Sequence, residues 1–313
     1  MATDSIKFGK NMVSREELLS PGHRACQGCG LAINIRLALK VLGKDTICMT
    51  PASCWSGVGS MYPDAAWEIP WMQTLFENVS PVAGGINAAH KILEEKGKRQ
   101  HRKINSLCFA GDGATADIGL GSLSGTLERG HDIIYICMDN EAYMNTGIQR
   151  SSATPHGAST TTTPVGRVQS GQLTQKKDVP AIITDHHIPY VATACASYPF
   201  DYMEKVRKAA EVDGPAYIHV FSVCPTGWRV PPERTVDVGK LAVETGIFPL
   251  YEVENGVYKL NVKPAKLKPV DEYVKMQGRF RHLKPDEIAE MQENVTRSWE
   301  ALLKRIEASQ ASA

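Results

Sequence analysis

Two short polar motifs each follow an apolar segment, and one helix length separates the two segments. Gly111-Asp112-Gly113 follows the apolar residues 107–110, and Asp139-Asn140 follows the apolar residues 133–138. Apolar runs of this length are typical of strands that are buried on both faces of a parallel sheet. Between them, the apolar side chains from Thr115 to Leu127 fall near one face of a helix. The sequence therefore predicts an α/β fold with a doubly wound, mostly parallel sheet.

Asp112 and Asn140 are expected just beyond the carboxyl ends of their strands, where open α/β sheets bind ligands. A carboxylate and an amide oxygen suit Mg²⁺, which prefers hard oxygen ligands and often shares them with a phosphate. Gly111 and Gly113 would let the backbone approach a diphosphate closely, and the start of the next helix would attract its charge. Either motif alone is common in ordinary turns. Their combination, with Asn145 shortly after, predicts a metal–diphosphate site.

This combination resembles the thiamine diphosphate motif, which runs from Gly-Asp-Gly to an asparagine at this spacing. The resemblance implies that Asp112, Asn140 and the backbone carbonyl of Ala142 coordinate Mg²⁺. Asn145 and Thr146 are expected to contact the diphosphate or the reacting substrate, as catalytic residues. The residues expected around the cofactor are Gly111, Asp112, Gly113, Ala114, Asn140 and Asn145.

The eight cysteines divide into two groups by their sequence context. Four lie in apolar, strand-like runs, where free cysteine behaves as a small core hydrophobe: Cys48, Cys108, Cys137 and Cys195. The other four lie in loops marked by glycine, proline or tryptophan: Cys26, Cys29, Cys54 and Cys224. A disulfide framework is not expected, because the chain is long and nothing in it indicates secretion.

The four loop cysteines are expected to bind a metal centre. Cys26 and Cys29 form a Cys-x-x-Cys pair, and two distant single cysteines can complete a shell of four thiolates. Structural zinc sites usually bring two close pairs. One close pair with two single cysteines, of which Cys224 precedes a proline, favours a [4Fe-4S] cluster. Zinc remains the alternative at this point.

Taken together, the two motifs resemble the thiamine-diphosphate-binding β subunit of 2-oxoacid:ferredoxin oxidoreductases, in particular the pyruvate:ferredoxin type. The resemblance implies that the four loop cysteines ligate the [4Fe-4S] cluster nearest the thiamine. It also implies that the glutamate acting on the pyrimidine ring comes from a partner subunit, with Glu77 as the only local rival. The matching segments are Gly22–Gly30, Trp71–Asn78, Gly111–Leu120, Asp139–Pro164 and Cys224–Trp228.

The resemblance implies oxidative decarboxylation of a small 2-oxoacid, with single electrons passing through the cluster to ferredoxin within a complex of several subunits. One loop departs from the pattern: the segment Ala52–Trp55 reads Ala-Ser-Cys-Trp, where pyruvate enzymes usually have Thr-Gly-Cys and polar residues. Because Cys54 is expected to lie against the cofactor, this change bears on the substrate. Pyruvate, converted to acetyl-CoA and CO₂, and oxalate, converted to CO₂, are both candidates, and within the family the chain most resembles oxalate oxidoreductase.

Two other functional classes are compatible with these residues. One is a non-redox thiamine-diphosphate-dependent decarboxylase or synthase subunit whose loop cysteines bind structural zinc, which an iron-free, colourless protein would support. The other is a non-enzymatic assembly subunit whose thiamine diphosphate site has decayed. Asp112, Asn140 and the intact glycines argue against the second class.

Composition narrows the partners and the organisation of the chain. With a net charge of +1, the chain has no strong positive electrostatic field that would attract nucleic acid or an anionic membrane surface. No apolar run approaches the roughly 20 residues of a membrane helix, and together with the free cysteines this favours the cytoplasm. We expect one α/β domain over 1–230, including a long functional loop at 151–176. We expect 231–313 to be an arm that contacts partner subunits, with a hairpin across Asn255-Gly256 and a helix over 285–308.

Overall fold

The computed structural model describes residues 9–311 and contains an eight-stranded sheet in the order β2-β1-β3-β4-β6-β5-β7-β8. The first six strands in the chain run parallel, and the last two are antiparallel to their neighbours. The predicted mostly parallel α/β sheet is therefore confirmed. The strands are β1 (Thr46–Pro51), β2 (Trp71–Thr74), β3 (Asn105–Gly111), β4 (Ile134–Asp139), β5 (Tyr190–Cys195), β6 (Ala216–Phe221), β7 (Tyr251–Glu254) and β8 (Val257–Leu260).

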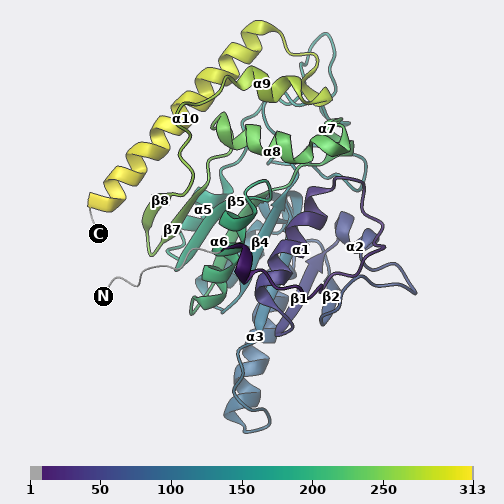
Figure 1. Ribbon diagram of the computed structural model, residues 1–313, viewed down its shortest axis with the longest axis vertical. Helices are drawn as coiled ribbons and strands as arrows, with labels where there is room; N and C mark the ends of the chain where they lie inside the picture. The colour runs from purple at the N-terminus through teal and green to yellow at the C-terminus, as the bar shows by residue number, and fades with distance from the viewer. Residues whose placement is uncertain (1–8, 312–313) are drawn as a thin grey trace.

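Helices cover both faces of the sheet (Figure 1). Side chains alternate along each strand, so Leu107 and Phe109 of β3 join one core cluster while Cys108 and Ala110 join the other. The strands therefore read as continuous apolar runs in the sequence. The helices are α1 (Gly30–Leu42), α2 (Cys54–Val58), α3 (Val79–Glu95), α4 (Leu120–Glu128), α5 (Val179–Thr184), α6 (Pro199–Glu211), α7 (Pro225–Trp228), α8 (Thr235–Glu244), α9 (Val270–Lys275) and α10 (Pro285–Ala311).

The helix predicted from Thr115 to Leu127 is wrong at its start. The chain after β3 forms a π-helix over Gly113–Ile118, and α4 begins only at Leu120. Gly119 lies between them, and a Cβ atom there would come within 2.1 Å of the Ala114 carbonyl oxygen. The close backbone approach at Gly119 interrupts the regular helix, which apolar spacing alone does not reveal. π-Helical turns of this kind are frequent at functional sites.

The predicted hairpin across Asn255-Gly256 is confirmed, and both turn residues have positive φ angles, 49° and 85°. However, the hairpin does not stand apart from the first domain. β7 pairs antiparallel with β5, with Val253 opposite Val191, so the hairpin extends the central sheet. Position 230 is consequently not the end of the sheet, because the exposed edge of β5 provides the pairing partner for β7.

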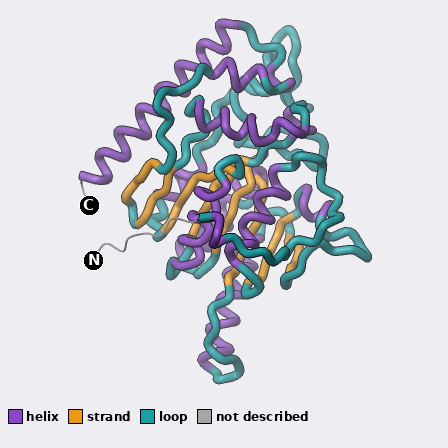
Figure 2. Tube along the Cα trace, viewed as in Figure 1, coloured by secondary structure: helices purple, strands orange, loops and turns teal. Residues whose placement is uncertain are grey.

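The long C-terminal helix α10 lies along one side of the molecule beside β8 (Figures 1 and 2). Leu302 and Ile306 are buried against the sheet, whereas most of the other side chains of α10 are exposed or half-buried. The predicted contact of this region with partner subunits stays a prediction. The ends of the two predicted regions, 1–8 and 312–313, lie outside the described residues. Within 9–311, no helix is both long enough and apolar enough to cross a membrane.

Candidate cofactor and metal site

The site lies at the carboxyl ends of four neighbouring parallel strands. β1, β3, β4 and β6 are adjacent in the sheet, and each is followed within three residues by one predicted site residue. The register pairs Gly111 of β3 with Met138 of β4, so the residues that follow these strands start at nearly the same level. The site residues delivered by β1, β3, β4 and β6 are, in that order, Cys54, Asp112, Asn140 and Cys224.

Asp112, Asn140 and the carbonyl of Ala142 converge as predicted, and all three residues are buried. With its amide nitrogen turned toward them, Asn140 donates to Asp112 Oδ1 at 3.0 Å and to the Ala142 carbonyl oxygen at 2.8 Å. In the opposite amide orientation, three oxygens meet at these separations. Neighbouring ligands of an octahedral Mg²⁺, with metal–oxygen distances of about 2.1 Å, are about 3 Å apart. The three oxygens are therefore spaced to share one Mg²⁺ ion.

The carboxylate of Asp112 is held in an environment that disfavours its charge in the absence of a cation. Burial, together with the neighbouring Asp139 carboxylate, raises the pKa of Asp112 well above its usual value. The hydroxyl of Ser151 donates a hydrogen bond to Asp112 Oδ2 and orients it. Thr154 in turn donates to the Glu141 carbonyl oxygen at 2.6 Å. The beginning of the predicted functional loop thus forms one wall of the site.

The two glycines of the Gly-Asp-Gly motif have different roles. A Cβ atom on Gly111 would meet nothing within 4 Å, so this position leaves open space beside Asp112. A Cβ atom on Gly113 would come within 2.3 Å of the Tyr143 ring, so this glycine makes room for a side chain. The Tyr143 hydroxyl donates to Asp117 at 2.8 Å. Only Gly111 therefore fits the predicted close approach of a diphosphate, and Ala114 is buried next to Gly113.

Asn145 and Thr146 lie in the turn that follows Ala142, and both are exposed. Thr146 contacts Gln149, with its hydroxyl donating to the Gln149 side-chain oxygen, instead of a residue of the metal-binding group. Their predicted contact with diphosphate or substrate stays a prediction. Glu77 is half-buried, and its backbone carbonyl accepts a hydrogen bond from Ser122, which agrees with a structural role for this residue.

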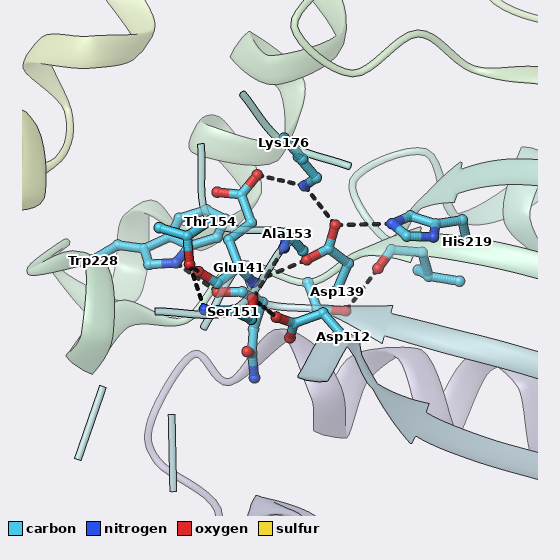
Figure 3. A network of polar contacts seen from close by, with 12 residues as sticks. Asp112, Asp139, Glu141, Ser151, Ala153, Thr154, Lys176, His219 and Trp228 are labelled. Carbon is cyan, nitrogen blue, oxygen red and sulfur yellow. Dashed lines mark hydrogen bonds and ion pairs between the residues drawn. The ribbon is translucent and has the colours of Figure 1, made fainter. Parts of the chain in front are cut away.

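Beneath the three oxygens lies a network of buried charged groups that the sequence did not indicate (Figure 3). Asp139 pairs with Lys176 at 2.5 Å and with His219 at 2.8 Å. Burial opposes the charge of Asp139, but Lys176 and His219 lower its pKa below the usual value. Burial alone would lower the pKa of His219, but the neighbouring Cys137 and Asp139 raise this pKa to about 10. This shift favours the protonated form of His219, which would form an ion pair with the Asp139 carboxylate.

Glu141 stands between the predicted ligands Asn140 and Ala142 and belongs to the same network. Its φ angle is 65°, in the left-handed region, and its side chain is 2% exposed. Its amide donates to Asp139 Oδ1 at 2.9 Å. The carboxylate forms ion pairs with Lys176 at 2.7 Å and with Arg279. The sequence did not single out Glu141 or Lys176, because charged residues are common in loops. Arg279 lies in the predicted arm, far along the chain from the other members of the network.

The four loop cysteines approach one another at the same edge of the sheet. The Gly30 amide donates to the Val223 carbonyl oxygen at 3.0 Å, which places Cys29 beside Cys224. Burial raises the pKa of Cys54 to about 12, with further contributions from Cys224, Cys29 and Cys26 and from Asp112. The loop of Cys54 therefore lies beside the predicted metal ligands. Within residues 9–311, no three His, Cys, Asp or Glu side chains are positioned to hold a single metal ion.

Sequence comparison places this geometry in a known class of enzymes. Residues 55–220 match the family model described as thiamine pyrophosphate enzyme, C-terminal TPP binding domain. The pyruvate synthase subunit PorB of Methanocaldococcus jannaschii is 55% identical over 282 residues, which cover 90% of this chain and 95% of that protein. The ketoisovalerate oxidoreductase subunit VorB of Pyrococcus furiosus is 47% identical, over 93% of this chain and 94% of that protein.

A solved structure shares the fold of this chain at low sequence identity. It is the 2-oxoglutarate:ferredoxin oxidoreductase from Magnetococcus marinus, with a TM-score of 0.55 and 21% identity over 75% of this chain and 83% of that chain. The family model that matches residues 55–220 defines a thiamine-diphosphate-binding enzyme domain. The chain belongs to the family of thiamine-diphosphate-binding β subunits of 2-oxoacid:ferredoxin oxidoreductases, of the pyruvate synthase type.

Proposed function

We propose that this chain binds Mg²⁺ and thiamine diphosphate for the oxidative decarboxylation of pyruvate, and that it passes single electrons through a [4Fe-4S] cluster toward ferredoxin. The observation that carries this proposal is the convergence of the Asp112, Asn140 and Ala142 oxygens, at separations of 3.0 and 2.8 Å, beside a cysteine loop. The Asn140 amide can turn either its nitrogen or its oxygen toward Asp112 and Ala142. With the oxygen turned in, a divalent cation would take the place of the two hydrogen bonds that the nitrogen makes.

Each residue of the site has a defined task in this proposal. Asp112, Asn140 and Ala142 hold the cation, and Ser151 orients Asp112 through its hydrogen bond. The open space at Gly111 admits a diphosphate oxygen, which would complete the cation's coordination. When bound, thiamine diphosphate supplies the ring that takes up the electrons left as CO₂ departs from a 2-oxoacid.

The loop cysteines fit a cluster that accepts one electron at a time. A hydrogen bond from a backbone amide reaches one of the sulfurs: the Gly227 amide donates to Cys224 Sγ at 3.3 Å. Such donors stabilise thiolate charge and tune the potential of iron–sulfur clusters. We assign Cys26, Cys29, Cys54 and Cys224 as the ligands of a [4Fe-4S] cluster in this chain.

Pyruvate is the substrate that we propose, because a relative with 55% identity over nearly the whole chain is named as a pyruvate synthase subunit. The relative named for ketoisovalerate, at 47% identity, makes a branched 2-oxoacid the second candidate. Oxalate rests only on the unusual segment Ala52–Trp55. Turnover of the three acids by the purified complex, with and without coenzyme A, would separate them. Oxalate turnover without coenzyme A would overturn the assignment of pyruvate.

We also propose that the chain acts in the cytoplasm within a complex of several subunits. The relatives are named as subunits, and the middle of the long loop exposes apolar side chains. Val168 is fully exposed and Leu173 is 61% exposed, although the beginning of the same loop is buried. Exposed apolar groups on a loop beside a cofactor site suit a protein partner. The expected partners are the other subunits, ferredoxin and the small 2-oxoacid, without nucleic acid or membrane.

Asp112→Ala tests the metal–diphosphate site. The variant removes the anionic ligand, so we expect the affinity for thiamine diphosphate at saturating Mg²⁺ to fall on the order of 100-fold or more. Isothermal titration of the purified complex measures this, and circular dichroism reports whether the fold persists. Asp271→Ala is the matched control, because its carboxylate is 41% exposed and pairs with Lys275 at the surface of α9. Wild-type affinity in Asp112→Ala would place the cofactor elsewhere.

A further inference from the structure

A second layer of residues behind the three oxygens connects two loops that are far apart in the sequence. Trp228, in the loop of Cys224, is fully buried, and its indole Nε1–H donates to the Asn140 carbonyl oxygen at 2.9 Å. The guanidinium of Arg279 lies over the Trp228 ring, 3.9 Å from the ring centroid. The matched thiamine diphosphate domain ends at residue 220, so both side chains come from outside it.

Arg279 is one of the most deeply buried charges in the described residues, with its side chain 3% exposed. Its guanidinium donates to the carboxylate of Glu141 and to the side-chain oxygen of Gln277, the latter at 2.9 Å. Removing one partner of a buried ion pair leaves an uncompensated charge and is strongly unfavourable. The position of Arg279 therefore determines where the Glu141 carboxylate can lie.

The position of Glu141 in turn sets the direction of the metal-binding backbone. Its φ angle of 65° is unfavourable for a residue with a side chain and persists only when the surroundings impose it. Four contacts impose it here. The Glu141 amide donates a hydrogen bond to Asp139, and the Glu141 carbonyl oxygen accepts one from Thr154. The Glu141 carboxylate forms ion pairs with Lys176 and Arg279. Because Glu141 lies between Asn140 and Ala142, this turn aims the Ala142 carbonyl toward the other two oxygens.

We propose that Arg279 is a positioning residue for the Mg²⁺–diphosphate site, which it orients through Glu141 on one side and through Trp228 and Asn140 on the other. The inference rests on the proposed function of the site. It assigns a role in cofactor binding to the C-terminal segment, which lies outside the matched cofactor domain. A guanidinium suits this position because its plane stacks on an indole while its edge donates to a carboxylate, which a lysine ammonium cannot do at once.

The test compares Arg279→Met and Arg279→Lys with Arg281→Met in the purified complex. Arg281 lies two residues away and is exposed, so it is the matched control. Substitutions of outer-shell residues typically weaken metal affinity 10–100-fold, and we expect this loss for Arg279→Met in the affinity for Mg²⁺ and thiamine diphosphate. Arg279→Lys should fall between Arg279→Met and the wild type. Isothermal titration measures these affinities, with melting temperatures recorded in parallel.

Two further single variants, neither of which contains Arg279→Met, keep the proposal testable if Arg279→Met fails to fold. Trp228→Phe retains a ring beneath the guanidinium but removes the hydrogen bond to Asn140, so we expect a smaller loss, of about tenfold. Glu141→Gln should weaken binding on its own. Where Arg279→Met folds, the double variant Glu141→Gln/Arg279→Met should lose less affinity than the sum of the two single losses, because both substitutions remove the same ion pair. Fully additive losses would overturn the proposed route through Glu141.

A merely structural role for Arg279 makes a different prediction. In that case Arg279→Met would lower the melting temperature, while the folded protein would bind Mg²⁺ and thiamine diphosphate as tightly as Arg281→Met. That result, obtained while Asp112→Ala abolishes binding, would overturn this inference and leave the proposed function intact. Unchanged binding in Asp112→Ala as well would instead overturn the proposed function.

Discussion

The eight cysteines occupy two contrasting environments along the same set of strands. Cys48, Cys108, Cys137 and Cys195 lie within β1, β3, β4 and β5, and each is at most 1% exposed. The other four lie in the loops around the carboxyl ends of the strands and are half-buried or exposed: Cys26, Cys29, Cys54 and Cys224. At the end of β1, the core cysteine Cys48 and the loop cysteine Cys54 are only six positions apart.

Thiol acidity does not distinguish the two groups. Burial raises the pKa of Cys195 to about 11, and it raises the pKa of Cys224, in a loop, to about 11 as well. The two groups differ in how exposed their sulfurs are and in whether the sulfurs lie close together. The loop sulfurs lie near one another, and Cys224 Sγ accepts a hydrogen bond from a backbone amide. A bound metal centre would have to supply the charge that stabilises the loop thiolates. Geometry, more than acidity, therefore marks a ligand in this protein.

Substitution of one cysteine from each group should have opposite effects on bound iron. Cys54→Ser removes a ligand from the proposed cluster, so anaerobically purified protein should lose most of the roughly four irons per chain expected at this site. Cys195→Ser, within β5, should retain them. Iron analysis and the brown absorption of the protein measure the difference. Equal iron in both variants would contradict the division, and zinc in place of iron would support the non-redox alternative.

Chemical labelling of the iron-free chain should sharpen the same comparison. We expect iodoacetamide under native conditions to modify Cys26 first, because it is the exposed cysteine among the described residues. The half-buried Cys29, Cys54 and Cys224 should follow. The strand cysteines should react only when the sheet opens, so their labelling should be slower than that of the loop cysteines by a factor on the order of 100 or more. Peptide mass spectrometry over a time course follows each thiol. Early labelling of Cys108 would show that β3 is less protected than its packing indicates.

The sequence predicted the sheet and the meeting of Asp112 with Asn140 at its edge, because both depend on local pattern. β4 spans Ile134–Asp139 and so lies within one residue of the apolar run 133–138, since a strand buried on both faces reads as a continuous apolar run. Asp112 and Asn140 were found because parallel strands bring their carboxyl ends to one edge. These features need only the spacing of residues along about one strand–helix–strand unit.

The sequence could not predict what depends on contacts between distant segments. Gly119 interrupts the expected helix through a backbone approach to Ala114 that no periodicity reports. Arg279 lies 138 positions from its partner Glu141, and nothing in the charged segment around it distinguishes it from surface arginines. The hairpin at Asn255-Gly256 was recognised, but its pairing with β5 was not, because an antiparallel edge strand carries no signal of its neighbour.

The smallest expected effect is on the stability of the iron-free chain, where a core cysteine should matter more than a loop cysteine. In the iron-free chain, Cys108→Ala should lower the free energy of unfolding by about 1 kcal/mol, because it removes a fully buried sulfur that packs in the core. Cys54→Ala should change it by less than about 0.5 kcal/mol, since this half-buried loop thiol has no cluster to hold. Chemical denaturation of the two variants and the wild type measures both values. A larger loss in Cys54→Ala would mean that the loop thiols already stabilise the fold without iron.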